Sequence, residues 1–274
     1  PLHSNYFLGI FDGHGLSGHV KADYAAATLP KLLLERLSKY KDGQYSDAQI
    51  RRAFSSVFWQ VHREGPLIHD SGCTASVIVR LQQHLYFANV GDSRSMLVRI
   101  DPKQQYVNIT HITKPHKPND PKERQRIVTA GCVVTDPIPL QDPTARVTES
   151  LESGMALAMS RSIGDYDLEH CGVTPEPTVT VVDLAKHNKS KHSLNPILLA
   201  VSISDGIMDA VSLQDVVQAL AVPFWKPNTY QDTFASPLEQ AAEDLIRTAS
   251  DRWLMNTTFF PYRDDITIAV RRVQ

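Results

Sequence analysis

Residues 71–100 read SGCTASVIVRLQQHLYFANVGDSRSMLVRI, and this stretch decides the fold class. Three segments in it, Thr74–Val79, Leu85–Val90 and Ser95–Ile100, are rich in β-branched and aromatic residues, which favour strands. They are joined by Gln82-Gln83 and by Gly91-Asp92-Ser93, both short enough for tight connections. The pattern predicts a β-meander at the centre of the chain.

The region before this stretch predicts one strand and two helices. Tyr6–Phe11 is an apolar run typical of a buried strand. Leucines four residues apart over 29–37 indicate a helix, and Pro30 within it predicts a kink or a restart. A second helix begins where Ser46 and Gln49 form a capping box.

The region after the stretch continues the mixture of helices and strands. We expect a helix from Asp120-Pro121 to Gly131, because the proline suits a first helical turn and the glycine suits a helix end. The remaining expected elements are a loop over 136–154, strands Thr178–Val182 and Ile197–Ile203, an exposed loop over 186–195, a helix over 236–254 and a strand Ile266–Val270. Consecutive strands with helices in pairs predict an α+β fold, and no internal linker divides residues 1–274 into domains.

Composition excludes several classes of protein. The 274 residues carry a formal net charge of -2, which gives no nucleic-acid or membrane signature. No run of about 18 apolar residues occurs, so no membrane span is expected. The chain has three cysteines, Cys73, Cys132 and Cys171. Their odd number and wide spacing disfavour a disulfide framework and a zinc site of the usual spacing. We expect three free thiols in a reducing compartment, the cytosol or the nucleus.

Three carboxylates stand at the ends of apolar strands. Asp12 follows one such strand, Asp205 follows another, and Asp264 precedes a third. If they converged, they would form a hard-oxygen site suited to Mg²⁺ or Mn²⁺, and two such ions could activate water against a phosphate. Asp-Gly is also a common turn dipeptide, so each motif taken alone is more typical of a plain turn than of a metal ligand. Spacing alone does not bring the three together.

Seven motifs, taken in order, resemble the type 2C family of metal-dependent serine/threonine protein phosphatases. They extend from about Tyr6 to Val270 and include FDGHG at 11–15, SGCTA at 71–75, ANVGDSR at 88–94, HKP at 116–118, LAMSRSIGD at 157–165, SDGIMD at 204–209 and RDDIT at 263–267. The resemblance implies a β-sandwich of two mainly antiparallel sheets flanked by helices, a four-layer α-β-β-α arrangement. It also implies hydrolysis of phosphoserine and phosphothreonine in proteins by a metal-activated water.

The resemblance assigns roles to the residues of the acidic motifs. Asp12 would bridge two metal ions, Mg²⁺ or Mn²⁺, and the backbone carbonyl of Gly13 would bind one of them. Asp205 and Asp264 would be further carboxylate ligands of the same ion of the pair. His14 is similar to the family's general acid, which protonates the leaving oxygen, and an imidazole suits that role because its pKa lies near neutrality.

Other residues keep two interpretations. Asp92 and Asp209 resemble the ligands of a third metal, but they also fit a hairpin turn and a helix N-terminal turn. Thr74 either supports the centre through a hydroxyl hydrogen bond or is an ordinary strand residue. Arg161 either contacts a flap or substrate or makes a structural ion pair. Leu151 to Gly172 and the flanking loop are where such enzymes place a flap that shapes the substrate site.

The chain departs from the family pattern in two places. Family members carry a phosphate-holding arginine and a metal-binding acidic pair on a strand before the first acidic turn, and we expect that part upstream of Pro1. The phosphate-binding residues are therefore unknown. Asp265 stands where the family usually has asparagine. We expect a monomeric phosphatase acting on phosphoproteins; the alternatives are an inactive phosphatase-like binding or regulatory module and, more remotely, another two-metal hydrolase.

Overall fold

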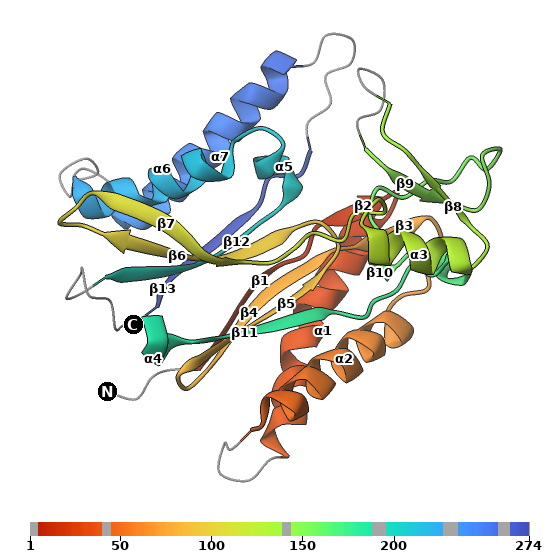
Figure 1. The fold of residues 1–274 in the computed structure, drawn as a ribbon, viewed down its shortest axis with the longest axis horizontal. Helices are drawn as coiled ribbons and strands as arrows, with labels where there is room; N and C mark the ends of the chain where they lie inside the picture. Colours follow the sequence, from red (N-terminus) through yellow and green to blue (C-terminus); the bar gives the residue numbers. More distant parts are fainter. Residues whose placement is uncertain are drawn as a thin grey trace.

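The computed structural model describes residues 5–39, 45–138, 144–187, 196–226, 235–256 and 264–273. Two four-stranded antiparallel sheets form its centre (Figure 1). The first has the order β1-β4-β5-β11, with bounds Tyr6–Ile10, Ala75–Leu81, His84–Val90 and Thr178–Asp183. The second has the order β13-β12-β6-β7, with bounds Ile268–Val273, Ile197–Ile203, Arg94–Asp101 and Tyr106–Ile112.

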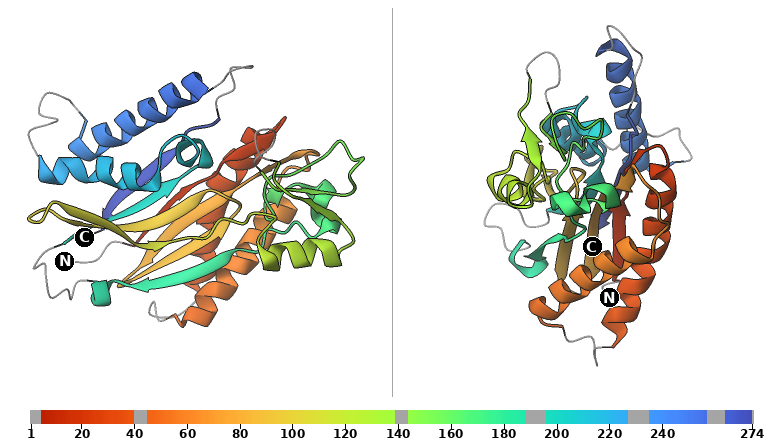
Figure 2. Two further views of the ribbon diagram at one scale, coloured as in Figure 1. Left: turned by 45° about the horizontal axis from the view of Figure 1, so that its top comes forward. Right: turned by 90° about the vertical axis from the view of Figure 1, so that its right-hand side faces the viewer.

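Pairs of helices cover the outer face of each sheet. Helices α1 (Gly18–Ser38) and α2 (Asp47–Glu64) share a core with the first sheet. Helices α6 (Leu213–Trp225) and α7 (Pro237–Asn256) pack on the second. The two pairs lie on opposite sides of the sandwich in Figures 1 and 2. The predicted four-layer α+β arrangement is therefore confirmed.

Strand β4 shows why the first sheet lies inside the molecule. All seven of its residues are buried, as a strand covered on both faces requires. Val77 and Val79 join the core under α1 and α2, whereas Ile78 between them joins the core between the two sheets. The side-chain period of two residues thus distributes one apolar run between two cores. Phe87 of β5 meets Leu97 of β6 in the inner core.

The predicted meander is only half right. Strands β4 and β5 pair as a hairpin, but β6 pairs with β7 and β12 in the other sheet. The segment Gly91-Asp92-Ser93 is therefore a crossover between sheets. Gly91 has φ of +89°, and a Cβ placed on it would lie 2.7 Å from Cγ2 of Thr74. Glycine is needed for this crossing, and a sequence pattern does not distinguish it from a hairpin turn.

Other local expectations had mixed outcomes. The Ser46–Gln49 capping box is present at the start of α2, and Gly131 follows α3 (Pro121–Thr129) with φ of +90°. The predicted restart at Pro30 is wrong, because α1 continues through it; burial of the leucines at 29, 33 and 37 outweighs the lost hydrogen bond. The turn expected at Asp12–Gly15 contains a short strand, β2 (Gly13–Gly15). Strand β7 and helix α6 were not predicted, and the loop expected over 186–195 lies mostly outside the described residues.

A smaller unit lies at one end of the sandwich, and we call it the satellite unit. It consists of α3, β8 (Val133–Thr135), β9 (Arg146–Thr148) and the short helix η2 (Tyr166–Cys171), which surround their own small core (Figures 1 and 2). β9 lies within the expected loop.

A disulfide joins Cys132 to Cys171 inside the satellite unit, so the expectation of three free thiols is wrong. Cys73 is a free, buried thiol. The two bonded residues are 39 positions apart, and only the folding of α3 against η2 brings them together. In the described part of the chain, no helix is long and apolar enough to cross a membrane.

Candidate active site

A pocket of about 1190 Å³ opens where the acidic strand ends of the two sheets meet the satellite unit. Every residue to which the sequence assigned a catalytic or metal-binding role lines it: Asp12, Gly13, His14, Asp92, Asp205, Asp209 and Asp264. The structure thus brings together carboxylates that are separated by as many as 252 positions. Asp12, Asp205 and Asp264 therefore converge in the folded chain, which their spacing in the sequence could not establish.

Asp12 is held by a reciprocal pair of hydrogen bonds to Thr74. Its backbone N–H donates to Thr74 Oγ1 at 3.1 Å, and the Thr74 N–H donates to the Asp12 carbonyl at 2.8 Å. The Thr74 hydroxyl also bonds Ser93 Oγ at 2.8 Å, within the buried sheet-to-sheet crossover. Of the two interpretations of Thr74, the supporting hydrogen bond is therefore the one present. It fixes the end of β1 against both sheets.

Ser204 brings Asp205 close to the segment that carries Asp264. The Ser204 hydroxyl accepts from the Thr267 N–H at 3.0 Å and donates to the Asp265 carbonyl at 2.9 Å. Asp205 is the first residue of the short helix α5 (Asp205–Met208). A Cβ on Gly206 would lie 2.4 Å from the Asp265 carbonyl oxygen, so only glycine permits this approach.

The pocket gathers negative charge at its base. Burial, followed by the charges of Asp205 and Asp264, raises the pKa of Asp12 well above its ordinary range. Burial, followed by the charges of Asp92 and Asp264, likewise raises the pKa of Asp205. Like charges in a partly desolvated site repel one another unless a cation or a proton neutralises them.

The donor set fits a hard divalent cation. All of its side-chain donors are carboxylate oxygens, which Mg²⁺ and Mn²⁺ prefer. Among the described residues, the Oδ1 atom of Asp92 is buried without a hydrogen-bond partner. An unpartnered carboxylate oxygen beside repelling carboxylates is the chemistry that a bound cation would satisfy.

His14 is paired with Asp165. Its Nε2 lies 2.6 Å from Asp165 Oδ2, and its Nδ1 is buried without a partner in the described part of the chain. Burial lowers the pKa of His14, but the hydrogen bond and charge of Asp165 outweigh it, so the net shift is upward. Asp165 has a left-handed backbone with φ of +48°, and its N–H donates to the Ser71 carbonyl at 3.0 Å.

Sequence reasoning did not assign a role to Asp165. Its only signal was its place at the end of the motif spanning 157–165. Its side chain lies over Gly72, where a Cβ would be 2.1 Å from Asp165 Oδ2. The pairing with His14 depends on β3 (Ser71–Cys73) lying between β2 and β10 (Ile163–Gly164), which only the folded sheet order reveals.

Asp92 and Asp209 are not where the turn interpretations placed them. Asp92 lies in the crossover rather than in a hairpin turn, and Lys117 Nζ donates to its Oδ2 at 2.5 Å. Asp209 is the C-terminal cap of α5 rather than part of a helix N-terminal turn, and its N–H donates to the Asp205 carbonyl at 2.8 Å. Burial raises the pKa of Asp209, against the effect of Lys117. The Lys117 ammonium group thus already pairs with Asp92 and also acts on Asp209.

Arg161 makes a structural ion pair. Its Nη2 lies 2.6 Å from Glu123 Oε1, and its Nη1 donates to the Glu176 carbonyl at 2.8 Å. Arg161 is not among the residues that line the pocket, so its structural interpretation is the one supported. Part of the predicted flap does line the pocket, through residues 154–159 together with Asp165 and Leu168.

Comparisons with known proteins agree on one family. The family profile described as "Protein phosphatase 2C" matches residues 2–253. A "Probable protein phosphatase 2C 48" from Oryza sativa subsp. japonica is 31% identical over 270 residues, which cover 89% of this chain and 69% of that protein. "Protein phosphatase 1L" from Bos taurus is 32% identical over 218 residues, covering 77% of this chain and 53% of that protein.

A solved structure supports the fold. The crystal structure of a serine-threonine phosphatase 2C from Toxoplasma gondii matches with a TM-score of 0.68 at 18% identity, covering 97% of this chain and 84% of that one. The fold and the matching family profile define the class as the protein phosphatases. The chain belongs to the protein phosphatase 2C family. The chain spans between half and about two thirds of the length of the curated relatives that it matches.

Proposed function

We propose that this chain removes phosphate from phosphoserine and phosphothreonine in proteins, with residues 1–274 acting as one catalytic domain. The convergence of Asp12, Asp205 and Asp264 beside His14 carries the proposal. Membership of the phosphatase family supports it, and the retained acidic set disfavours an inactive binding or regulatory module.

Asp12, the Gly13 carbonyl, Asp205 and Asp264 would hold two Mg²⁺ or Mn²⁺ ions, and Asp92 with Asp209 a third. When bound, such ions activate water as a nucleophile near neutral pH and stabilise negative charge on phosphoryl oxygens. The protein's own task is to keep the carboxylates fixed, through the Thr74 and Ser204 hydrogen bonds.

His14 would supply the proton to the leaving serine or threonine oxygen. Because Nε2 faces Asp165, the transferable proton would be on Nδ1, the nitrogen without a partner among the described residues. Asp165 would hold the ring in place and stabilise the imidazolium before transfer. The raised pKa of His14 favours the protonated form that a general acid requires.

Substrate binding would involve the satellite unit. Lys117 and Arg146 are cationic residues among those that line the pocket, and Met155 to Met159 form an adjoining, largely apolar wall. These features suit a phosphorylated polypeptide segment, which carries a dianion on an extended chain. We retain the cytosol or nucleus as the expected compartment and a monomer as the expected state. Three free thiols do not support that compartment, because Cys132 and Cys171 form a disulfide.

The test is hydrolysis of a phosphothreonine peptide. We expect activity with Mn²⁺, its loss with EDTA, and its loss in Asp205→Ala. Leu254→Ala, at an exposed position on α7, is the matched control and retains activity. Activity indifferent to both EDTA and Asp205→Ala would exclude the two-metal reaction. Binding of the phosphopeptide without turnover, in a chain extended upstream, would favour the regulatory module.

A further inference from the structure

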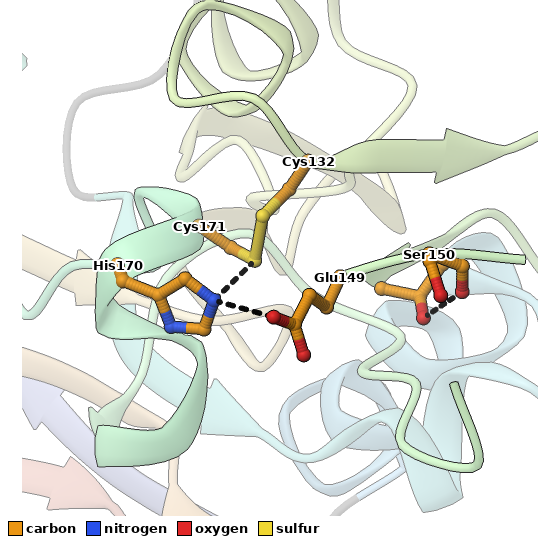
Figure 3. The surroundings of a disulfide bond; sticks show 6 residues. Cys132, Glu149, Ser150, His170 and Cys171 are labelled. Carbon is orange, nitrogen blue, oxygen red and sulfur yellow. Dashed lines mark hydrogen bonds and ion pairs between the residues drawn. A yellow bond between two sulfur atoms is a disulfide. The ribbon is translucent and has the colours of Figure 1, made fainter. Parts of the chain in front are cut away.

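A second cluster of metal-ligand side chains lies in the satellite unit, outside the acidic pocket (Figure 3). Cys132 follows α3, and Cys171 ends η2 beside His170. One ligand atom from each of these three residues lies within 4.8 Å of the others. Glu149, just after β9, adds a carboxylate oxygen 3.7 Å from His170 Nε2. In Figure 3 the imidazole points toward both the Cys171 sulfur and this carboxylate.

We propose that the reduced chain binds Zn²⁺ at this cluster, through Cys132, Cys171, His170 and Glu149. Zinc takes two thiolates, an imidazole and a carboxylate in tetrahedral geometry, with bonds of about 2.3 Å to sulfur and about 2.0–2.2 Å to nitrogen and oxygen. Tetrahedral angles then separate sulfur from nitrogen by about 3.6 Å, and nitrogen from oxygen by about 3.3 Å. Cys171 Sγ and His170 Nε2 are 3.6 Å apart, so this edge of the tetrahedron is already formed.

The cluster is accessible to an ion although its sulfurs are inside. The side chains of His170 and Glu149 are 56% and 67% exposed, whereas Cys171 is fully buried and Cys132 is 7% exposed. Water can therefore deliver the ion to the imidazole and carboxylate side, while the thiolates face the small core. The two cysteine Cα atoms are 5.3 Å apart, which leaves the sulfurs free to separate by rotation of their side chains once reduced.

The zinc site and the disulfide exclude each other. Two thiolates lose one electron each to form the S–S bond, and a peroxide can accept both electrons by cleavage of its O–O bond, which yields two hydroxide ions. Zn²⁺ undergoes no redox change and leaves as the aqueous ion, because a disulfide has no thiolate to bind it. The pair thus has two states, metal-bound when reduced and cross-linked when oxidised.

The two states act on the same structural element. η2 starts immediately after Asp165, the hydrogen-bond partner of His14, and ends at Cys171. Either the zinc ion or the disulfide therefore anchors the C-terminal end of this helix. Leu168 belongs to the core of the satellite unit and also lines the acidic pocket. The inference is independent of the proposed phosphatase reaction, since none of its four ligands lines that pocket.

The experiment uses Co²⁺ as the spectroscopic probe and Zn²⁺ as its competitor. The whole chain is reduced, freed of reductant under argon and titrated with Co²⁺ in excess Mg²⁺, which competes for the oxygen-rich pocket. We expect one Co²⁺ per chain with a near-ultraviolet sulfur-to-cobalt band, displaced by Zn²⁺. Peroxide should abolish the band and release one Zn²⁺ per chain. The oxidised wild type, which should show no band, needs no substitution and serves as the folded reference.

Variants then separate the ligands. His170→Ala should weaken Zn²⁺ binding by about tenfold or more, and Cys171→Ser should weaken the band, because one of the two thiolates is lost. His69→Ala is the matched control, because His69 is an exposed histidine paired with Asp167 on the same helix η2; its Zn²⁺ affinity should equal that of the wild type. No sulfur band in the reduced wild type, a full band in Cys171→Ser, or unchanged affinity in His170→Ala would each overturn the proposal.

Discussion

The acidic pocket and the satellite unit arrange their charged groups in opposite ways. The pocket gathers carboxylates that repel one another, as the raised pKa of Asp12 records, and it holds them on the ends of two four-stranded sheets. The satellite unit has a small core and pairs its buried charge, since Glu123 meets both Arg126 and Arg161. A large scaffold of two sheets can thus hold repelling carboxylates in place, whereas a small unit needs paired charges and a disulfide for its stability.

Asp12→Asn should have the largest effect, because we expect it to lower activity and to raise the stability of the metal-free chain. Loss of the carboxylate proposed to bridge two metal ions should reduce turnover of a phosphothreonine peptide by about a thousandfold or more. The same change removes a carboxylate that burial and its neighbours destabilise, so the midpoint of thermal unfolding in EDTA should rise at pH 7. Activity assays and thermal scans in EDTA measure the two effects.

Asp251→Asn is the control for that variant. Asp251 is an exposed carboxylate on α7 and does not line the acidic pocket, so both quantities should stay at the wild-type level. A lower unfolding midpoint for Asp12→Asn in EDTA would show that the carboxylates stabilise the metal-free chain, contrary to our account of the pocket.

The His14–Asp165 pair predicts an effect that depends on the leaving group. His14→Ala should slow hydrolysis of a phosphothreonine peptide by about 10²- to 10⁴-fold, because the departing alkoxide then lacks a proton donor. The p-nitrophenolate ion of p-nitrophenyl phosphate is a stable anion that leaves without that proton, so hydrolysis of this substrate should slow much less. Asp165→Asn should give the same pattern with a smaller loss, since it acts through His14.

A steady-state comparison of both substrates measures this effect. His69→Ala provides a matched histidine, which is exposed and bonded to Asp167 rather than to Asp165. Equal losses on the two substrates would assign His14 to a role other than proton donation.

The sequence predicted the sandwich far better than the satellite unit, and the reason is physical. Alternating and continuous apolar runs determine strands such as β12, whose predicted bounds Ile197–Ile203 match the structure. Relations between distant segments leave no periodic signal. Patterns therefore did not predict the crossing at Gly91, the Cys132–Cys171 bond or the pairing of Asp165 with His14.

The residues of the candidate site were predicted through ordered motifs rather than through chemistry. Asp-Gly at Asp12 and at Asp205 is a common turn dipeptide, and only the resemblance joined the two. Their proximity depends on the hydrogen bonds of Thr74 and Ser204, whose hydroxyls look ordinary in a strand pattern. Local preference determined the elements, and tertiary contacts determined the site.

Glu123→Gln should show how far the satellite unit depends on paired charge. Glu123 is 5% exposed and accepts from Arg161 at 2.6 Å and from Ser160 Oγ at 2.7 Å. Removing one partner of a buried ion pair leaves the other uncompensated, which costs about 3–5 kcal/mol of unfolding free energy. Urea unfolding measures the loss.

Asp136→Asn is the matched comparison for this effect. Asp136 pairs with Arg124 at 2.6 Å, but its side chain is 72% exposed, and water screens an exposed pair, so Asp136→Asn should lose much less stability than Glu123→Gln. Equal losses in the two variants would show that burial does not set the value of these ion pairs.

The smallest effect concerns His116, which joins the two regions. Its N–H donates to the Gly91 carbonyl in the sheet crossover, and its own carbonyl accepts from the Ser160 N–H. Burial first, and then the charge of Arg161, lower the pKa of His116 to about 3. The unfolded chain, with an ordinary pKa of about 6.5, therefore binds more protons between these values.

Stability from a neutral His116 is thus complete above pH 6.5 and is lost as the pH falls toward 3, by about 2 kcal/mol at pH 5. His116→Asn should be less stable at pH 7, because it gives up the packed ring and the 2.9 Å bond to Thr178 Oγ1. Its unfolding free energy should nevertheless fall less between pH 7 and 5 than that of the wild type. Urea titrations at both pH values measure the two slopes. Because the pKa of Glu123 is lowered, the loss of stability caused by its protonation begins below pH 5. Equal slopes in the wild type and His116→Asn would show that His116 does not titrate with unfolding.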